Sequence, residues 1–367
     1  MASEHTPLSE EPVTVAFATD DGYAPYLLVA LASVLRRLKP VRRCDIVVLD
    51  QNIAPFWRER LQDVVSSREG ATLHLRDVSH LDGKLKSMFT RRGNRGKVTK
   101  WTYAAYYRLF LASLLPHCRR LVYLDVDTLA CDDLALLHDM DMKGRSVACA
   151  TDVCLCFDPV LRESRRTLDM CGHDMKRYFN SGVLVIDLER WRATDFEERA
   201  TEQLCSLPHL VYPDQDILNI LFRDDRVDLD MRWNFLTPQM SAELDDECAA
   251  RRRDEITASC DFGIIHFAGL KPWRRPEAAP FASLWWACAR AAGVDGDIVR
   301  HEAALLRSYL EAKEKGARLN SLRVQAIILR LQLVCALGRR KEHLSGKLQR
   351  VRQKLQMARA ARSRRLS

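Results

Sequence analysis

The stretch LVYLDVDTLA, at residues 121–130, is an apolar run that ends in two carboxylates. A charge placed in a protein core is costly unless something pairs with it. Either the chain turns here and returns Asp125 and Asp127 to water, or the two side chains bind a cation. Residues two apart on a strand project from the same side, so extended geometry would let both carboxylates converge on one point. Two hard oxygen ligands suit Mg²⁺ or Mn²⁺, but the spacing alone does not choose between turn and metal site.

The segments around this run alternate between strand and helix patterns. Buried strands are predicted at 13–18, 44–50, 72–78, 120–125, 146–151, 182–187 and 262–267, and helices at 25–38, 54–65, 100–115, 188–205 and 214–223. Residues 82–97, basic and bearing glycines, are predicted as a loop. This alternation predicts an α/β fold with a mainly parallel sheet. Ligands of such sheets bind outside the carboxyl ends of the strands, where Asp20 and Asp125 fall.

Charge divides the chain into a body and a tail. Residues 301–367 hold 17 Lys and Arg against 4 Asp and Glu, a net +13; of the chain's 57 basic and 49 acidic residues this leaves 40 and 45, a net −5. We therefore expect a disordered leader at 1–12, a folded body at 13–292 and a basic helical region at 293–367, with helices at about 301–315, 321–337 and 341–360. The last predicted helix carries an apolar stripe, and its Lys and Arg residues lie off this stripe. The stripe consists of Leu344, Leu348, Val351 and Leu355.

Composition favours a cytoplasmic protein. No uninterrupted apolar stretch approaches the roughly 20 residues that span a bilayer, and the acidic start MASEHTPLSEEP is not a secretory signal. The chain has twelve Cys but no CxxC pair, which is typical of reduced core thiols rather than of disulfides or a zinc site.

Phosphatases that form an aspartyl-phosphate are an alternative, because they also carry Asp-x-Asp after an apolar strand. Their motif normally continues Gly-Thr and lies early in the chain. Here Asp127 is followed directly by Thr128, a third of the way along. The phosphatase is therefore the second choice.

Three downstream segments carry further polar residues. IIHFAGLKPW, at 264–273, has a strand that delivers His266, then Gly269 and Lys271. An imidazole beside two carboxylates suits Mn²⁺ better than Mg²⁺, a glycine lets the backbone approach a phosphate, and a lysine suits a diphosphate. FNSGVLVIDLERW, at 179–191, is predicted to begin with a polar turn, and YPDQDILNILF, at 212–222, opens a helix with two acids around Gln215. Turn formation and helix capping explain these polar residues equally well, except Gln215.

Taken in order, FATDDGY, YYRLF, LVYLDVDTL, FNSGVLVIDLERW, YPDQDILN and HFAGLKPW resemble glycosyltransferase family 8. The resemblance runs from about Val13 to Trp273. The family includes bacterial lipopolysaccharide galactosyl- and glucosyltransferases and, more distantly, glycogenin. It implies a GT-A domain that uses Mn²⁺, with Mg²⁺ as the alternative, and a UDP-sugar. Two features depart from the family pattern. The family often has Asn where Gly22 stands, and the spacing from Gly269 to Lys271 is one residue shorter than usual.

The resemblance also implies roles for individual residues. The metal ligands would be Asp125, Asp127 and His266. The uridine pocket and the rest of the donor site would contain Ala18, Asp20, Tyr23 and Val126. The transferred sugar would be surrounded by Arg108, Asp152, Asn180, Asp214 and Gln215, of which Asp152, Asp214 and Gln215 are the catalytic candidates. Gly269 and Lys271 would bind the diphosphate.

The implied reaction retains the anomeric configuration. Retention ordinarily uses a carboxylate nucleophile with a second acid. Gln215 is a poor nucleophile, so we expect a same-face substitution through a short-lived ion pair, with the amide oxygen steadying positive charge. The partners expected are a nucleotide sugar and a saccharide acceptor. For the basic tail we expect an anionic membrane surface at the inner face of the membrane and no nucleic acid, because aromatic residues do not alternate with its charges. A catalytically inactive, transferase-like scaffold is the remaining alternative.

Overall fold

The computed structural model describes residues 10–91, 103–155, 168–169, 172, 174–207, 210–242, 244, 246–311, 347, 349–351 and 353. The chain divides into two compact units, the first unit (residues 1–268) and the second unit (residues 269–367). Among the described residues, no helix combines the length and apolar character that crossing a membrane requires.

The first unit contains a seven-stranded sheet of order β3-β2-β1-β4-β7-β6-β8 and a three-stranded sheet of order β5-β10-β9. In chain order the strands are β1 (Val13–Asp20), β2 (Cys44–Gln51), β3 (Ala71–Asp77), β4 (Arg120–Leu124), β5 (Thr128–Ala130), β6 (Val147–Thr151), β7 (Phe179–Asp187), β8 (Arg226–Asp228), β9 (Phe235–Leu236) and β10 (Ile264–His266). In the larger sheet β7 runs antiparallel to β4 and β6, and the other pairings are parallel. The predicted α/β fold with a mixed, mainly parallel sheet is confirmed.

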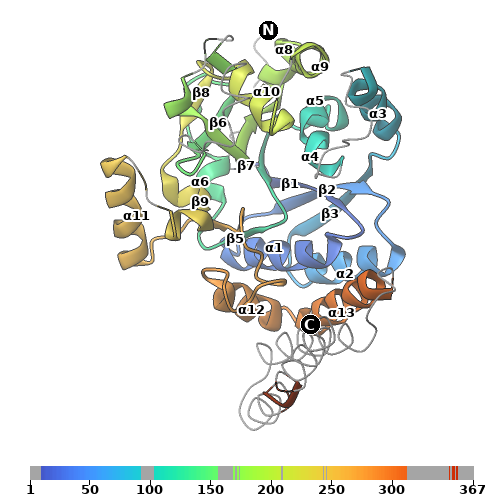
Figure 1. The fold of residues 1–367 in the computed structure, drawn as a ribbon. Coiled ribbons are helices and arrows are strands. Elements are labelled where there is room, and N and C mark those ends of the chain that lie inside the picture. Colours follow the sequence, from blue (N-terminus) through green and yellow to red (C-terminus); the bar gives the residue numbers. More distant parts are fainter. Residues whose placement is uncertain are drawn as a thin grey trace, which may run out of the picture. The chain divides into compact units, whose positions relative to one another are not determined.

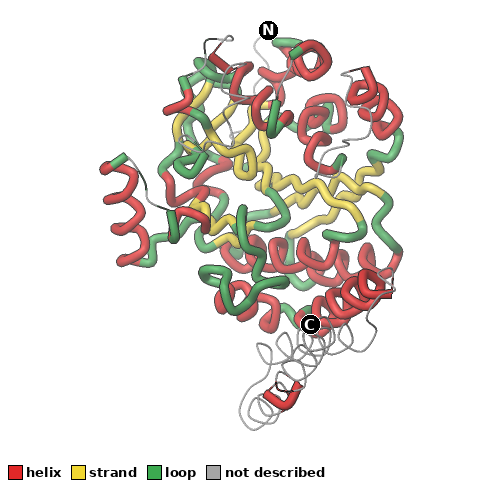
Figure 2. The backbone as a smooth tube through the Cα atoms, in the orientation of Figure 1, coloured by secondary structure: helices red, strands yellow, loops and turns green. Residues whose placement is uncertain are grey.

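Helices lie on both faces of the larger sheet. In chain order they are α1 (Ala24–Arg37), α2 (Pro55–Ser66), α3 (Leu81–Arg91), α4 (Ala104–Tyr107), α5 (Leu111–Leu114), α6 (Ala135–His138), α8 (Leu188–Ala193), α9 (Phe196–Ser206), α10 (Pro213–Leu221) and α11 (Glu247–Ser259), with 3₁₀ turns η1 (Arg108–Phe110), η3 (Met175–Arg177), η4 (Met231–Asn234) and η5 (Thr237–Met240). Helices α1 and α2 cover one face, and α3, α4, α5 and α8 to α10 lie over the other (Figure 1). The strands therefore form a central layer between helices (Figure 2).

Burial on both faces explains why the central strands are continuously apolar. Val15, Ala16 and Phe17 follow one another in β1 and are all fully buried, as expected for a parallel strand covered by helices on each side. On the face that carries α8 to α10, the rings of Trp191 and Phe196 lie 3.9 Å apart and those of Phe196 and Phe222 lie 5.0 Å apart. These aromatic contacts join α8, α9 and the end of α10 into one core.

Three predicted elements outside the candidate site differ from the structure. The predicted loop at 82–97 begins as helix α3, because Leu85 and Met88 lie three residues apart on one helix face and enter the core; its part from residue 92 lies outside the described residues. The predicted helix at 100–115 is broken into α4, η1 and α5. The predicted helix at 188–205 is interrupted between α8 and α9, where Asp195 adopts a left-handed conformation with φ 47°.

The second unit contains α12 (Ala282–Ala291) and α13 (Asp295–Glu311). The rings of Trp273 and Trp285 lie 5.2 Å apart, and the Trp286 indole N–H donates to the carbonyl of Pro272 over 3.0 Å. The first predicted tail helix, 301–315, coincides with the end of α13 as far as residue 311. The other two tail helices lie almost entirely outside the described residues.

Candidate active site

The acidic pair lies at the carboxyl end of β4, in a turn rather than on an extended strand. Strand β4 ends at Leu124, and the amide and hydroxyl of Thr128 donate to the carbonyl of Asp125 over 3.2 and 2.8 Å. The turn brings Asp125 and Asp127 to the same side, a convergence that we attributed to persistent strand geometry. Their side chains keep 27% and 14% exposure, so the pair reaches solvent and its oxygens are accessible to a cation.

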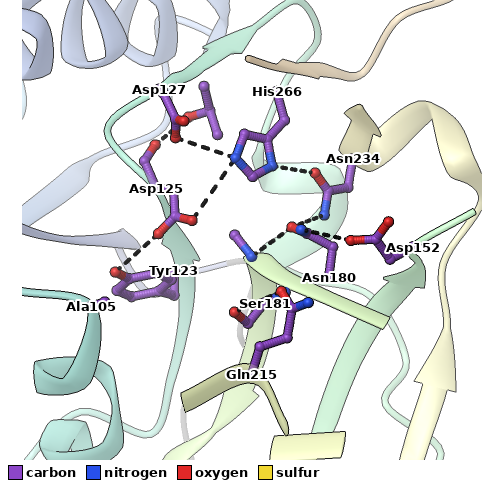
Figure 3. Close-up of polar contacts among 12 residues, drawn as sticks. Ala105, Tyr123, Asp125, Asp127, Asp152, Asn180, Ser181, Gln215, Asn234 and His266 are labelled. Atoms are coloured by element: carbon purple, nitrogen blue, oxygen red, sulfur yellow. Dashed lines mark hydrogen bonds and ion pairs between the residues drawn. The ribbon is translucent and has the colours of Figure 1, made fainter. Parts of the chain in front are cut away.

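His266 completes this group from a distant part of the sequence. It ends β10, which pairs antiparallel with β5 and places His266 opposite Thr128. The ring Nε2 lies 3.2 Å from Oδ1 of Asp127 and 3.9 Å from Oδ2 of Asp125. Ligand atoms of the three residues all lie within 4.8 Å of one another, and Figure 3 shows the three side chains facing one another. The predicted metal ligands are therefore brought together.

Gly182 makes room for this cluster. It lies inside β7, which begins at Phe179, so residues 180–182 belong to a strand and not to the predicted turn. A Cβ at position 182 would lie 2.2 Å from Cε1 of His266 and 2.7 Å from Oδ2 of Asp125. The Gly182 carbonyl also accepts the Asp125 amide over 2.8 Å. Glycine is required here because the β7 backbone forms one wall of the acidic cluster.

Arg108, in η1, connects Asp125 with the sugar-side residues. Its Nη2 donates to Oδ1 of Asp125 over 2.8 Å, and its Nη1 donates to the carbonyl and hydroxyl of Ser181 over 2.6 and 3.0 Å. Nε lies 3.5 Å from the Asp214 carboxylate. Burial alone would lower the pKa of Arg108, but the neighbouring Asp125, Tyr123 and Asp214 together more than offset this effect and the pKa is raised. Arg108 is therefore a fixed cation that orients one oxygen of Asp125 and leaves the other facing His266.

Helix α10 presents Asp214 and Gln215 to this site. The Gln215 Oε1 accepts hydrogen bonds from the amide and hydroxyl of Ser181 over 2.9 and 3.3 Å, and Nε2 donates to the Tyr178 hydroxyl over 3.2 Å. Tyr178 in turn donates to Asp216 over 2.6 Å. Burial raises the pKa of Asp214, against the opposing charge of Arg108. Both candidates are buried side chains held by contacts with β7 and η1.

Asp152 and Asn180 form the opposite side of the cluster. Asn180 Nδ2 donates to Asp152 Oδ2 over 3.1 Å, and burial raises the pKa of Asp152. The other Asp152 oxygen accepts the amides of Cys154 and Leu155. Asp152 is therefore a buried carboxylate within a continuous polar network.

The predicted uridine pocket lies at the carboxyl end of β1. Ala18 is 8% exposed and Val126 6% exposed, and Asp20 Oδ1 accepts the Tyr23 amide over 3.0 Å in the turn before α1. The structure places these residues next to the turn that carries the acidic pair, since β1 pairs with β4. Their contacts with a nucleotide stay a prediction.

Gly269 and Lys271 belong to the second unit. Within it, the Lys271 carbonyl accepts the amides of Arg274 and Arg275 over 3.1 and 2.8 Å, so Lys271 begins a turn. Their predicted contacts with the diphosphate stay a prediction.

Asn234 and Tyr178 are site residues that the sequence did not single out. Asn234 contacts His266 and Asn180, and Tyr178 contacts Gln215. Each is a polar residue at the edge of a short apolar segment, which is a common pattern at turns. Only the pairing of β9 with β10 shows that Asn234 lies beside His266.

Comparisons with known proteins bear on this site. The model of "Glycosyl transferase family 8" matches residues 14–277. General stress protein A of Bacillus subtilis is 27% identical over 278 residues, which cover 74% of this chain and 91% of that protein. The lipopolysaccharide 1,2-glucosyltransferase of Escherichia coli (strain K12) is 32% identical over 181 residues, which cover 48% of this chain and 50% of that protein. Glycosyltransferase GlyF of Streptococcus pneumoniae is 28% identical over 307 residues, which cover 82% of this chain and 66% of that protein.

A solved structure agrees with these matches. The galactosyltransferase LgtC, in complex with donor and acceptor sugar analogs, is 27% identical with a TM-score of 0.61, over 76% of this chain and 96% of that one. The family model's match, over residues 14–277, includes the strands of both sheets, the acidic pair and His266. The chain therefore belongs to glycosyltransferase family 8, a family of retaining hexosyltransferases.

Proposed function

We propose that this chain is a Mn²⁺-dependent GT-A enzyme that moves a hexose, galactose or glucose, from a UDP-sugar to a glycan acceptor. The observation that carries the proposal is the convergence of Asp125, Asp127 and His266 beside the buried polar residues of β7 and α10. Lipopolysaccharide or another cell-surface saccharide is the proposed acceptor, in keeping with the named activity of the E. coli relative.

The residues present fit a divalent cation. Two carboxylates and one imidazole make a mixed oxygen and nitrogen donor set, which favours Mn²⁺ over Mg²⁺. Gly182 keeps the space beside them clear, since any Cβ there would occupy it. A bound divalent cation would offset the negative charge that develops on the departing diphosphate.

The protein's own groups then position the donor. Arg108 holds Asp125 and Ser181 together, and through Ser181 it is linked to Gln215. Both oxygens of Asp125 are thereby oriented, which preorganises the site before substrate binds. We assign Lys271 the role of a fixed cation for the diphosphate. Because Gln215 offers an amide and not a carboxylate, we assign retention to a same-face substitution through an ion pair.

A panel of nucleotide sugars, scored by nucleotide release with Mn²⁺, tests the proposal. Asp127→Asn is expected to abolish Mn²⁺-dependent turnover, whereas Gln215→Ala is expected to leave measurable activity. Asp63→Asn, which changes an exposed carboxylate of α2, is the matched control and should behave as wild type. A chain that releases no nucleotide from any UDP-sugar, with or without acceptor, would be a transferase-like scaffold.

The route of retention is tested separately. Complete loss of activity in Gln215→Ala, together with a sugar trapped covalently on Asp214 or Asp152, would replace the ion-pair route with double displacement. Residual turnover without a trapped sugar supports the same-face route.

We also propose that the enzyme acts in the cytoplasm at the inner face of the membrane. The support is the net charge of +13 at residues 301–367 and the apolar stripe near the C-terminus. In this proposal, residues 13–292 form the GT-A body and residues 293–367 form the membrane-binding helical region.

A further inference from the structure

A series of hydrogen bonds through two side-chain amides connects His266 to Asp152. His266 Nδ1 lies 2.9 Å from Oδ1 of Asn234, Asn234 Nδ2 donates to Oδ1 of Asn180 over 3.0 Å, and Asn180 Nδ2 donates to Asp152 over 3.1 Å. Figure 3 shows these contacts running from the acidic pair to Asp152. His266, Asn234, Asn180 and Asp152 are 3%, 2%, 8% and 2% exposed, so water does not compete easily for these bonds.

The orientation of both side-chain amides in this series follows from one backbone group. The Gly182 N–H donates to Asn180 over 2.9 Å, and because an N–H only donates, the atom it meets must be the Asn180 oxygen. That oxygen can accept but not donate, so Asn234 must present its NH₂ group to it. The Asn234 oxygen therefore faces His266.

The same reasoning fixes the imidazole. An amide oxygen beside Nδ1 requires a proton on Nδ1, because two acceptors would otherwise meet. With Nδ1 committed as a donor, Nε2 is the nitrogen that faces Asp127 and Asp125 over 3.2 and 3.9 Å. In metal sites, a hydrogen bond to the second ring nitrogen commonly fixes the tautomer and orientation of a histidine ligand.

We infer that Asn234 is a positioning residue, which holds the His266 ring so that Nε2 serves as the nitrogen ligand of a divalent cation. The inference rests on the metal site of the proposed function. Local structure supports it: Asp230 caps the start of η4, because its side chain accepts the Arg232 amide over 2.9 Å, and β9 follows η4 at once and pairs with β10. Asn234 is therefore held between η4 and β9, and the pairing of β9 with β10 places it beside His266.

The inference makes a prediction about metal preference. Nitrogen ligation favours Mn²⁺ over Mg²⁺, so loss of the nitrogen should weaken Mn²⁺ binding more than Mg²⁺ binding. Asn234→Ala is expected to lower Mn²⁺ affinity 10- to 100-fold and Mg²⁺ affinity much less. Asn234→Asp keeps an oxygen facing Nδ1 but loses the hydrogen bond to Asn180, so it should cost stability and yet retain the preference for Mn²⁺.

Binding can be measured without turnover. Free Mn²⁺ is counted by its electron paramagnetic resonance signal in the presence of UDP, and Mg²⁺ is titrated as a competitor. Asn219→Ala is the matched control, because Asn219 is also a fully buried amide and bonds the backbone of Phe179 and Gln215 rather than His266. It should lose stability as Asn234→Ala does but keep the wild-type ratio of Mn²⁺ to Mg²⁺ affinity.

A double-mutant cycle with His266→Ala separates positioning from general disruption. His266→Ala retains two carboxylates, so its Mn²⁺ affinity should stay measurable. If Asn234 acts through His266, adding Asn234→Ala to His266→Ala changes the affinity less than twofold. Equal losses for Mn²⁺ and Mg²⁺ in Asn234→Ala, or a full further loss in the His266→Ala background, would overturn the inference. A wild-type protein that binds no Mn²⁺ would instead refute the proposed function.

Discussion

Gln215 shows how strongly a single residue can be constrained by its neighbours. Its carbonyl oxygen has two lone pairs, and both face donors of Ser181. A carbonyl with two hydrogen bonds has little capacity left for a sugar. For Gln215 to steady positive charge on the sugar, the weaker bond, to the Ser181 hydroxyl at 3.3 Å, is the one that would have to be exchanged. Ser181 therefore takes part in setting what Gln215 can do.

Gly182→Ala tests the wall of the cluster. The added methyl group would meet the His266 ring and the Asp125 carboxylate at less than 3 Å, so one of them must move. Overpacking of this kind costs about 1–3 kcal/mol of stability, and we expect Mn²⁺ affinity to fall at least about tenfold. Thermal unfolding and Mn²⁺ titration measure the two effects. Gly144→Ala, at a glycine with nothing near its would-be Cβ but with φ 67°, should cost stability and leave Mn²⁺ binding unchanged.

Asp214→Asn tests the buried charge of α10. Burial raises the pKa of Asp214 in the folded protein, so the native state holds this proton to higher pH than the unfolded chain does. The stability contributed by the carboxyl is full below its unfolded pKa of about 4 and is lost as pH rises through the folded pKa. Asp214→Asn removes this loss. Relative to wild type it should gain stability as pH rises above about 4, until the Asp214 carboxyl is ionised in the folded protein, while transferase activity falls.

Denaturant unfolding at several pH values measures this difference. Asp63→Asn again serves as the control, because its carboxylate is exposed on α2. A gap between Asp214→Asn and wild type that stays constant with pH would show that Asp214 has no raised pKa in the folded protein.

At the scale of elements, sequence patterns predict the sheet well and the loops poorly. Mostly apolar runs such as 13–18 and 44–50 correspond to β1 and β2 because strands buried on both faces leave little room for polar residues. The short pieces β5, β8 and β9 lack such a run and were not predicted. Their positions depend on pairing with distant strands, as β5 does with β10.

The candidate site divides in the same way. Asp125, Asp127 and His266 could be found because each lies at or just after the end of an apolar strand. Asn180 and Ser181 were placed in a turn because their polar side chains resemble turn residues; in the structure they lie in β7 and are satisfied by Asp152, Gln215 and Arg108. Asn234 could not be found, since its role depends on the register of β9 against β10.

Leu85→Ala tests whether α3 is a packed helix. Leu85 is fully buried in the core cluster that includes residues of β1 and β2, and deleting a buried leucine side chain costs about 2–5 kcal/mol. Ser87→Ala, on the exposed side of the same helix, should change stability by less than about 0.5 kcal/mol. Chemical denaturation measures both. Equal, small effects would mean that residues 81–91 behave as the loop that the sequence pattern predicts.

At the scale of the whole molecule, opposite charges are separated along the chain. The acidic portion contains the candidate active site, and the basic portion contains the predicted amphipathic helix. An acidic catalytic body gains little from an anionic surface by itself, because like charges repel within about a Debye length. The basic region therefore carries the proposed attraction to a membrane.

Removing four basic charges from the tail tests this proposal in the full-length protein. Lys347, Arg350, Arg352 and Lys354 are changed to Gln; each basic residue near an anionic surface contributes about 1 kcal/mol of attraction, so binding to vesicles rich in anionic lipid should fall at least about a hundredfold. The control removes four exposed charges elsewhere, at Lys39, Arg76, Lys143 and Arg251, and should bind nearly as wild type. Co-sedimentation at low and high salt reads out both, since an electrostatic contact weakens with salt. If the two variants bind equally well, net charge rather than the tail governs adsorption. If the tail variant binds as wild type in every vesicle, the basic region serves another purpose, such as a solvated surface, and the proposed membrane contact does not depend on it.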